Sequence, residues 1–587
     1  MTESRSAWRS LVARAIAAEL AARAPGTPAP SPEDLVVETP PDSAMGDLGF
    51  PLFSLAKLLR SAPPAIAKAL EARLLADPEA LRQGRAKAVG PYVNVSLARA
   101  PEIARLLETA TGPAWGRGSG LGGKKVIVEF SSPNTNKPLH LGHLRNNVLG
   151  ESLSRILAAA GAQVHKINHI DDRGVHISKS MLAYRRYGEG KTPEGEGVKG
   201  DHFVGDYYVL FNRYKEEVPG AEEEAQELLK KWEEGDPETL ALWQKMKDWV
   251  MEGMRKTYER TGISFDEFDY ESDLYKFGRE EVLKGLERGI FFRADDGSVQ
   301  VNLEDAGLDT KVLLRKDGTS IYITQDIGTA IHRQATWPYD ELVYVVGNEQ
   351  QYHFKVLFEV LKRLGFAWAS DLHHLSYGMV NLPSGRMKTR EGTVVDADDL
   401  VDEVAALAKA EIEVKGREEA VGDHSQVAEK IALGAIHYFL LQVAPVKDML
   451  FDPAASLAFN GDTGPYIQYM GARASSILRK AASSEGPHRV GKVTPAKLEG
   501  EADWLLVRQV AAFPQAIEAA AARLDSSVMA GYLHELAAGF ATWYRDNPVL
   551  NNPDGDLAAS RLALVGTVKA TLEAGTRLVC IPFLESM

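Results

Sequence analysis

The sequence has few of the features that mark membrane or secreted proteins. Its 587 residues include one cysteine, Cys580, so no internal disulfide can form, and this usage fits a reducing compartment. No apolar run approaches the roughly 20 residues of a membrane-spanning helix. The first 25 residues carry charges at helical spacing, unlike the apolar core of a signal peptide. We therefore expect a cytoplasmic protein that does not bind membranes.

Excess positive charge is also lacking. The chain has 67 Lys and Arg against 81 Asp and Glu, a net charge of −14. This balance argues against indiscriminate binding of nucleic acid, but it does not exclude a local basic face. With 45% hydrophobic and 25% charged residues, the composition is that of a soluble globular protein, and the length predicts several domains.

The pattern of residues divides the chain into three predicted domains. Residues 1–115 indicate a small α+β domain, with helices around Pro51–Leu59 and Pro63–Leu75 and a strand at Tyr92–Leu97. The glycine-rich stretch that follows is typical of a linker. Residues 116–447 indicate an α/β domain, and residues 448–587, rich in alanine with helical periodicity, predict an all-α bundle.

The predicted α/β domain alternates strands and helices. A strand at Val126–Phe130, a helix over 141–160 and a strand at Val164–Ile170 form a βαβ unit, which requires a parallel sheet. Charged, helix-favouring sequence near 185–260 predicts a helical insertion. We expect the sheet to resume at three apolar segments, which are Val312–Leu314, Ile321–Ile323 and Leu342–Val346.

The most informative stretch, residues 131–145, links the first of these strands to its helix. His140 and His143 are three residues apart and lie on one face of the first turn. Gly142 between them lets a flat ring approach the backbone. Unpaired N–H groups and the helix dipole favour an anion here, such as a triphosphate.

Two other interpretations of this stretch remain open. Two histidines one turn apart can bind zinc, with further ligands from His165, His169 or His176, although these lack a recognised spacing. The polar residues of the stretch can also serve as helix caps. Capping explains Ser131, Ser132 and Asn134 but not the whole string.

Five motifs in order closely resemble the class I aminoacyl-tRNA synthetases, specifically the arginyl-tRNA synthetase family. The resemblance spans nearly the whole chain. In chain order the motifs are Ser132-Pro133-Asn134 with Lys137-Pro138 and His140-Leu141-Gly142-His143-Leu144-Arg145, then Tyr322-Ile323-Thr324-Gln325-Asp326, Gly347–His353, Gly385–Gly392 and Gly461–Tyr469 with Ala472-Arg473.

The resemblance implies a Rossmann-like catalytic domain with a helical insertion, a small N-terminal domain that binds the tRNA elbow, and a helical anticodon-binding domain. It also implies the joining of arginine to ATP, giving arginyl-adenylate and pyrophosphate, and then transfer of arginyl to the terminal ribose of tRNA. The partners it implies are arginine, ATP with Mg²⁺ as a substrate complex, and the tRNA for arginine. We expect a monomer, no protein metal site and no structural zinc.

Attack of a carboxylate on phosphorus needs positioning and charge neutralisation rather than a protein nucleophile. The family pattern gives these catalytic roles to His140, His143, Lys137, Arg386, Lys388 and Arg390, and ATP contacts to His140, Gly142, His143, Met387 and Lys388. The loop departs from the general class I motif, because Arg386 and Thr389 occupy the places of its two lysines. Many members of the family share this departure, and the resemblance implies that Lys137 supplies the missing charge. Read alone, the loop is also compatible with an exposed basic turn.

A guanidinium is a planar fork of donors that fixed carboxylates match best. By the family pattern Asp326 and Glu271 hold this group beside Tyr322, while Asn134 and Gln350, with Ser132, bind the α-amino and carboxylate end. Asp326 can alternatively be a helix N-cap, since it follows a predicted strand.

For tRNA, Tyr92 and Asn94 match positions that contact a D-loop base, where an aromatic ring can stack. The bundle would receive the anticodon through Tyr466, Tyr469, Arg473 and Trp543. Tyr92 can equally be a half-buried strand residue, and Tyr466 and Trp543 can be core residues.

The sequence is less compatible with three other functions. One cysteine disfavours the cysteinyl enzyme with its zinc ligands, and acidic Asp326 disfavours the glutamyl enzyme. A non-catalytic tRNA-binding paralogue is disfavoured by the intact His140, Gly142 and His143, while the altered loop keeps that alternative open.

Overall fold

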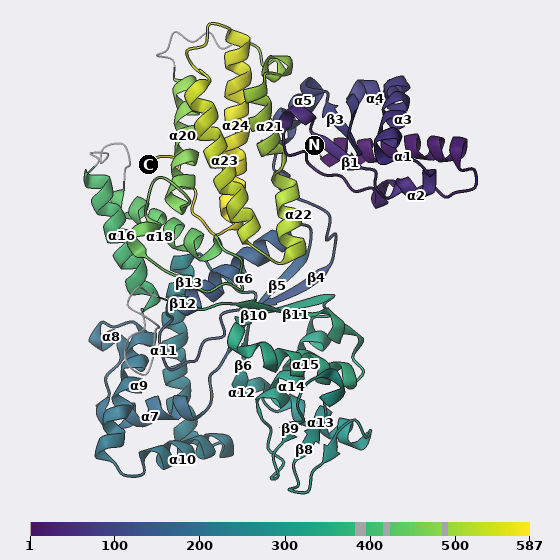
Figure 1. Cartoon of the computed structure of the whole chain (residues 1–587). Coiled ribbons are helices and arrows are strands. Elements are labelled where there is room, and N and C mark those ends of the chain that lie inside the picture. Colours follow the sequence, from purple (N-terminus) through teal and green to yellow (C-terminus); the bar gives the residue numbers. More distant parts are fainter. Residues whose placement is uncertain (1, 382–394, 415–422, 484–490) are drawn as a thin grey trace. The chain divides into compact units, whose positions relative to one another are not determined.

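The structure is a computed structural model that describes residues 2–381, 395–414, 423–483 and 491–587 (Figure 1). The chain forms two compact units. The first comprises Met1–Gly116, Arg473–Ala516 and Glu535–Leu572, and the second comprises Arg117–Ala472, Ile517–His534 and Glu573–Met587. Each is described below by itself. The predicted boundaries at 115 and 447 stay a prediction.

The N-terminal part of the first unit is a small α+β fold, as predicted. Its sheet is antiparallel with strand order β1-β3-β2, and the strands span Leu48–Pro51 (β1), Gly84–Val89 (β2) and Tyr92–Leu97 (β3). Apolar residues of alternating positions, such as Val93 and Val95, are fully buried against the helices. The helices are α1 (Thr2–Arg23), α2 (Leu55–Leu59), α3 (Pro63–Ala76), α4 (Pro78–Gln83) and α5 (Arg99–Thr109).

Helices from the end of the chain complete the first unit. A buried carboxylate, Asp503 on α21 (Glu501–Ala511), accepts hydrogen bonds from Trp543 Nε1 at 2.9 Å and from Arg561. The neighbouring Trp504 donates its Nε1 proton to Asp47, also at 2.9 Å. Burying these groups is tolerated because each polar atom has a partner. The longer helices are α23 (Ser527–Asp546) and α24 (Gly555–Leu578).

The second unit is organised by a parallel five-stranded sheet with order β11-β10-β4-β5-β6. This confirms the predicted parallel α/β domain. The central strand is buried on both faces, and Val126, Ile127 and Val128 have no exposed surface. The strands are β4 (Lys125–Glu129), β5 (Gln163–Ile170), β6 (Glu267–Tyr270), β10 (Glu341–Gly347) and β11 (Leu372–Tyr377).

Two predicted strands of this sheet are wrong. Val312–Leu314 forms part of β9 (Lys311–Leu314), which belongs to a separate antiparallel sheet with β7 (Phe292–Arg293) and β8 (Val299–Val301). Ile321–Ile323 leads into helix α14 (Tyr322–Thr336). The β-branched residues of this segment favour a strand locally, but Ile323, Ile327 and Ala330 recur at helical spacing and are buried together.

The predicted insertion is helical. It comprises α7 (Val175–Tyr187), α8 (Pro193–Glu196), α9 (Gly200–Glu217), α10 (Ala221–Glu234) and α11 (Pro237–Thr261). In the described ranges, no helix is both long and apolar enough to span a membrane. The remaining elements are α6 (Leu141–Ala159), α12 (Glu271–Leu274), α13 (Phe277–Glu287), α15 (Gln351–Arg363), β12 (Val380–Asn381), α16 (Ala397–Val414), α18 (His424–Leu441), β13 (Met449–Leu450), α19 (Pro453–Ser456), α20 (Gly464–Ala482) and α22 (Phe513–Arg523).

A buried arginine fixes helix α6 within the second unit. The guanidinium of Arg145 is fully buried and donates to four backbone carbonyls, with distances from 2.6 to 3.3 Å. These carbonyls belong to two segments that flank β12 and β13. These bonds to the two Nη groups offset much of the cost of burying the charge. Arg145 therefore secures the helix that begins at the two motif histidines.

Candidate functional site

The predicted site lies at the carboxyl edge of the parallel sheet, where ligands bind in open α/β folds. Asn134 follows β4 and forms an isolated parallel bridge with Asp171, the residue that follows β5. Ile170 pairs with Tyr270, so Asp171 and Glu271 are the first residues beyond two adjacent strands. The topology thus brings Asn134 and Glu271 to one edge.

The chain leaves β4 through a strained turn. Ser131 and Ser132 have φ values of 81° and 46°, a region that residues other than glycine rarely occupy. The turn is held by side chains, because Ser131 N donates to Asn146 Oδ1 at 2.5 Å and Ser132 N donates to Asn168 Oδ1 at 3.1 Å. The hydroxyls of Ser131 and Tyr258 are 2.7 Å apart. Among the described atoms, the buried Ser132 Oγ has no hydrogen-bond partner, as expected of a ligand contact.

The two motif histidines cap helix α6. His140 Nδ1 accepts from the backbone N–H of Gly142, and His143 Nδ1 accepts from the backbone N–H of His140, both at 3.1 Å. The two rings lie 3.9 Å apart between centroids. A Cβ on Gly142 would lie 2.9 Å from His140 Cε1, so glycine keeps the ring close to the backbone. The residues that cap α6 are therefore the two histidines, and not Ser131, Ser132 or Asn134 as the capping interpretation expected. The ligand site stays a prediction.

These hydrogen bonds define the protonation of both rings. Burial lowers the pKa of His140 to about 4 and the pKa of His143 well below its usual value, and the charge of Lys137 adds to both effects. Each neutral ring uses Nδ1 as an acceptor, so its proton is assigned to Nε2. A neutral ring offers a directed N–H donor to a phosphate and no positive charge, while the catalytic role of the two histidines stays a prediction.

Positive charge in the described part of the turn comes from Lys137. Burial lowers its pKa, and the carboxylate of Asp171 partly offsets that effect. A partly buried ammonium is stabilised strongly by a bound anion, because the low dielectric of the site strengthens their attraction. The other predicted phosphate contacts lie outside the described residues, and these are Arg386, Met387, Lys388 and Arg390.

The acidic part of the edge contains two of the predicted arginine-binding residues. Glu271 is 13% exposed, and burial raises its pKa to about 7 although Arg173 Nη1 lies 3.4 Å away. Asp326 is 41% exposed and lies 2.5 Å from His353 Nε2. Asp326 is in the second turn of α14, whose N-cap is Ile321, so the N-cap alternative for Asp326 is wrong.

Two further predicted contacts to arginine, Tyr322 and Gln350, lie at the starts of helices. Tyr322 is the first residue of α14, and its side chain is 78% exposed. Gln350 directly precedes α15 and is also exposed. Both remain accessible to a ligand at this end of the unit.

One residue of the edge was missed. Asp171 carries a pKa raised well above its usual value, first by burial and then by the charges of Glu271 and Asp326. Its side chain is nonetheless 39% exposed, so the carboxyl group remains accessible to solvent. The signal was available, since Asp171 is the first residue after a predicted strand.

The predicted tRNA contacts differ in accessibility. Tyr92 is partly buried, with its ring 5.8 Å from Phe53, whereas Asn94 is only 5% exposed and does not present its side chain at the surface. Trp543 is 4% exposed and bonded to Asp503, so it is a core residue. The three predicted contacts on α20 are partly buried, and these are Tyr466, Tyr469 and Arg473. The ring of Tyr466 lies 5.8 Å from that of His534. The guanidinium of Arg473 lies 4.9 Å from the ring of Tyr544.

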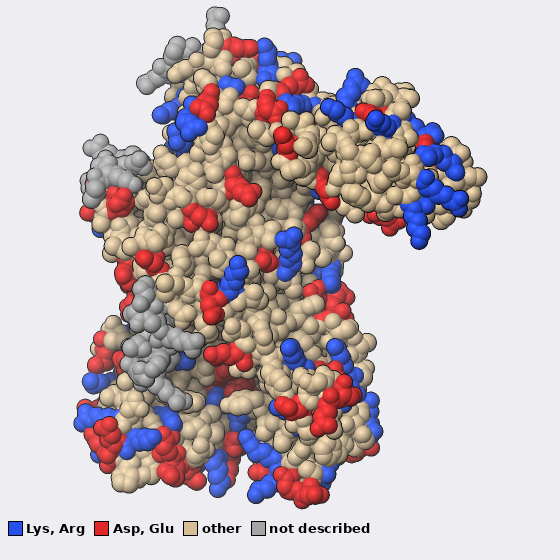
Figure 2. Space-filling model, in the orientation of Figure 1, with Lys and Arg blue, Asp and Glu red and all other residues tan. Residues whose placement is uncertain are grey.

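Basic side chains have a local concentration in the first unit. In Figure 2, Lys and Arg gather over α2 and its surroundings, in the N-terminal part that also contains Tyr92. Elsewhere on the face shown, acidic and basic side chains are intermixed. A local basic face is thus present despite the overall negative charge.

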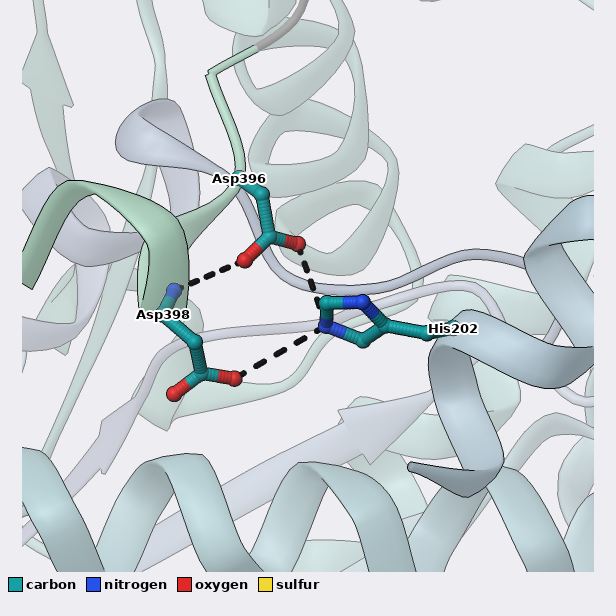
Figure 3. A group of neighbouring side chains, drawn as sticks. All are labelled: His202, Asp396 and Asp398. Atoms are coloured by element: carbon teal, nitrogen blue, oxygen red, sulfur yellow. Dashed lines mark hydrogen bonds and ion pairs between the residues drawn. The ribbon is translucent and has the colours of Figure 1, made fainter. Parts of the chain in front are cut away.

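The predicted zinc alternative receives little support from the described residues. His165 Nε2 lies 2.8 Å from Glu267, and His176 Nδ1 lies 3.1 Å from the Tyr208 hydroxyl. The group that offers metal ligands is a different one, formed by His202, Asp396 and Asp398 (Figure 3). There the ammonium of Lys199 already lies 2.6 Å from Asp398 Oδ2.

The protonation of the histidines is directly measurable. In protein labelled with ¹⁵N-histidine, we expect His140 and His143 to show the neutral tautomer with the proton on Nε2 from pH 8 down to about 5, because the pKa of each group is depressed by burial. The long-range ¹H–¹⁵N correlations of the rings report this state, with His140→Gln and His143→Gln to assign the signals. Titration of both rings near pH 6.5 would contradict the assignment.

Comparison with known proteins identifies related families. Residues 119–453 match the model described as tRNA synthetases class I (R), catalytic domain. Residues 8–97 match the arginyl tRNA synthetase N terminal domain, and residues 467–587 match the DALR anticodon binding domain. These matches follow the order of the parts described above.

Individual relatives agree with the family models. The chain is 54% identical over 562 residues to the arginine–tRNA ligase of Treponema denticola, covering 95% of each chain. It is 52% identical to that of Treponema pallidum, covering 99% of each. Its fold is similar to the solved arginyl-tRNA synthetase of Thermus thermophilus, with a TM-score of 0.80, 29% identity and coverage of 99% of this chain and 100% of that one. The chain therefore belongs to the arginyl-tRNA synthetase family of class I aminoacyl-tRNA synthetases.

Proposed function

We propose that this protein activates arginine with ATP to arginyl-adenylate and then transfers arginyl to the terminal ribose of its tRNA, for protein synthesis. One observation carries the proposal. The turn after β4 presents neutral histidine donors and Lys137 at the same sheet edge where Glu271 and Asp171 follow the neighbouring strands. Donors for phosphate and acids for a cationic substrate thus share one edge.

The activation step needs little covalent chemistry from the protein. A carboxylate oxygen of arginine attacks the α-phosphorus of ATP, the bond to the bridging oxygen breaks, and pyrophosphate leaves with its charge. The Nε2–H groups of His140 and His143 donate to phosphate oxygens, and Lys137 offsets the negative charge that develops. Arg386, Lys388 and Arg390 would add charge from the other side, and Mg²⁺ would arrive with the ATP.

Arginine carries two cationic groups, the guanidinium and the α-ammonium, and one carboxylate, so its site gains from negative charge near both cationic ends. We assign the guanidinium to Asp326 and Glu271 beside Tyr322, since paired carboxylates match its fork of donors. Arg173 orients Glu271 from the side. Asn134, Ser132 and Gln350 would bind the α-amino and carboxylate end, and Asp171, which forms a backbone bridge with Asn134, would lie next to that ammonium.

The tRNA contacts follow the surfaces that the structure leaves accessible. Tyr92 in the basic N-terminal part is the candidate for stacking on a base of the elbow. Tyr466, Tyr469 and Arg473 on α20 are the candidates for the anticodon, while Trp543 and Asn94 are structural. We further propose that the protein acts as a monomer in the cytoplasm.

Replacing Lys137 tests the phosphate side of the site. The Lys137→Ala variant removes a charge from a partly buried position, so we expect arginine-dependent ATP–pyrophosphate exchange with tRNA present to fall by about 100-fold. Lys191→Ala, which removes an exposed lysine of the insertion, is the matched control and should exchange at the normal rate. An exchange rate of the Lys137 variant within about twofold of wild type would exclude the assigned role.

Replacing Asp326 tests the arginine side. Asp326→Asn keeps the shape but removes the charge that the guanidinium needs, so we expect the KM for arginine to rise by at least about tenfold and the KM for ATP to change little. The control is Asp295→Asn, at an exposed aspartate of the same unit. Equal losses for arginine and ATP would show that Asp326 supports the fold instead.

A further inference from the structure

A short segment connects helix α16 to the histidine turn. Leu141 N donates to Val395 O at 3.0 Å, and Ala397 N donates to Leu139 O at 3.0 Å. Between them, His140 and Asp396 form an antiparallel bridge. The backbone of residues 395–397 is therefore paired with the backbone that carries His140, and any shift of one segment moves the other.

Asp396 joins this pairing to the start of α16. Its Oδ1 accepts from the backbone N–H groups of Asp398 at 2.8 Å and Asp399 at 3.2 Å, as an N-cap does. Its Oδ2 is buried and lies 3.3 Å from His202 Nε2, which is also 3.8 Å from Asp398 Oδ2. Figure 3 shows the imidazole of His202 placed between the two carboxylates.

The histidine comes from the insertion. His202 is on α9, one turn from Lys199, whose ammonium contacts Asp398 at 2.6 Å and Asp201 at 3.0 Å. Arg260 on α11 lies 3.5 Å from Asp398. The titratable and charged groups around the imidazole are Lys199, Asp201 and Asp206 on or next to α9, Arg260 on α11, Asp396, Asp398 and Asp402 on or next to α16, and Glu429 on α18.

This setting favours a charged imidazole. The carboxylate of Asp398, 3.8 Å away, and the charges of Asp396 and Asp201 raise the pKa of His202, against the effects of its own burial and of Lys199. The same contacts lower the pKa of Asp398. A cation here links two carboxylates that would otherwise repel each other across the first turn of α16.

We propose that His202 is a positioning residue for arginine activation. As an imidazolium it holds the side chains of Asp396 and Asp398. Through the paired segment 395–397 it fixes the direction of the His140 Nε2–H. The inference rests on the proposed function. It gives part of the helical insertion a direct role in the geometry of the phosphate-binding turn.

A metal ion bound by the same three residues is the competing interpretation. A histidine and two carboxylates can hold zinc. However, the ammonium of Lys199 already contacts Asp398, and Asp396 Oδ1 is used by two backbone N–H groups. The positive charges present balance the acids without an ion.

The pH dependence distinguishes a charged link from a structural one. Because the folded pKa of His202 is raised, its contribution is complete at low pH and is lost as pH rises through that pKa. We expect kcat/KM for ATP in the exchange reaction to show a decline on the alkaline side. His202→Gln should lack that decline. His202→Lys, whose charge persists to about pH 10, should shift the decline to higher pH.

The variants are compared in the full-length protein with tRNA. For His202→Ala we expect kcat/KM for ATP to fall by about tenfold at pH 7 and the Kd for arginine to stay within about twofold, since only the phosphate side is displaced. The ¹⁵N signal of His140 Nε2 should shift as well. His373→Gln, at a surface histidine of β11, is the control and should change none of these.

Three outcomes would overturn the inference. The first is a His202→Ala variant with wild-type kinetics and an unshifted His140 signal. The second is an equal loss of ATP and arginine binding, which would indicate a general loss of structure. The third is stoichiometric zinc in the purified protein that His202→Ala loses. A wild-type protein that catalyses no exchange would instead contradict the proposed function, while the His140 signal would still report the positioning.

Discussion

The turn that follows β4 is the constraint on which the rest of the site depends. Two consecutive serines adopt left-handed backbone conformations, each an unfavourable state that persists only when the surroundings fix it. Asn146, Asn168 and Tyr258 provide that fixation, and they come from a helix, a neighbouring strand and the insertion. The turn therefore forms only when these three elements are in place.

The turn positions the groups that we assign to both substrates, ATP and arginine. It directs the chain so that His140 and His143 cap α6 and hold their Nε2 protons available, while the bridge between Asn134 and Asp171 aligns the acidic side of the edge. Groups that bind phosphate and groups that bind a cation lie at the same edge of the sheet. Neutral donors and Lys137 serve phosphate, and Glu271, Asp326 and Asp171 serve a cation. The buried guanidinium of Arg145 keeps the helix under the histidines in position.

Much of this arrangement could be predicted from the sequence. The strand–turn–helix unit carries strong local periodicity, and its bounds agree closely with the structure. The helix expected around Pro51–Leu59 covers only Leu55–Leu59, because Pro51 ends β1, and the helical insertion begins at Val175 rather than near 185. The motif residues His140, Asn134 and Glu271 meet at one edge because a parallel sheet leaves few alternatives. What could be predicted is therefore what short-range pattern and topology determine.

The errors share a physical cause, which is dependence on tertiary contacts. Ile321–Ile323 has the local character of a strand, but its apolar residues pack as a helix. Trp543 suits base stacking as well as a core, and only its bond to Asp503 decides between the two. Asp171 and His202 belong to no recognised motif, since their roles depend on groups 100 or more residues away, such as Glu271 and Asp396. The lowered pKa of the histidines likewise depends on burial, and their tautomer on hydrogen bonds to Nδ1, neither of which the spacing of the residues reveals.

The measurement that tests the account most directly is ATP–pyrophosphate exchange with each of the twenty amino acids, with and without tRNA. A site with neutral donors for phosphate beside three carboxylates should support exchange with arginine and exclude uncharged and acidic amino acids by about a thousand-fold or more, since these supply no cation for the carboxylates. Exchange with arginine alone is the predicted result. Comparable exchange with another amino acid, or none with arginine in the presence of tRNA, would contradict it.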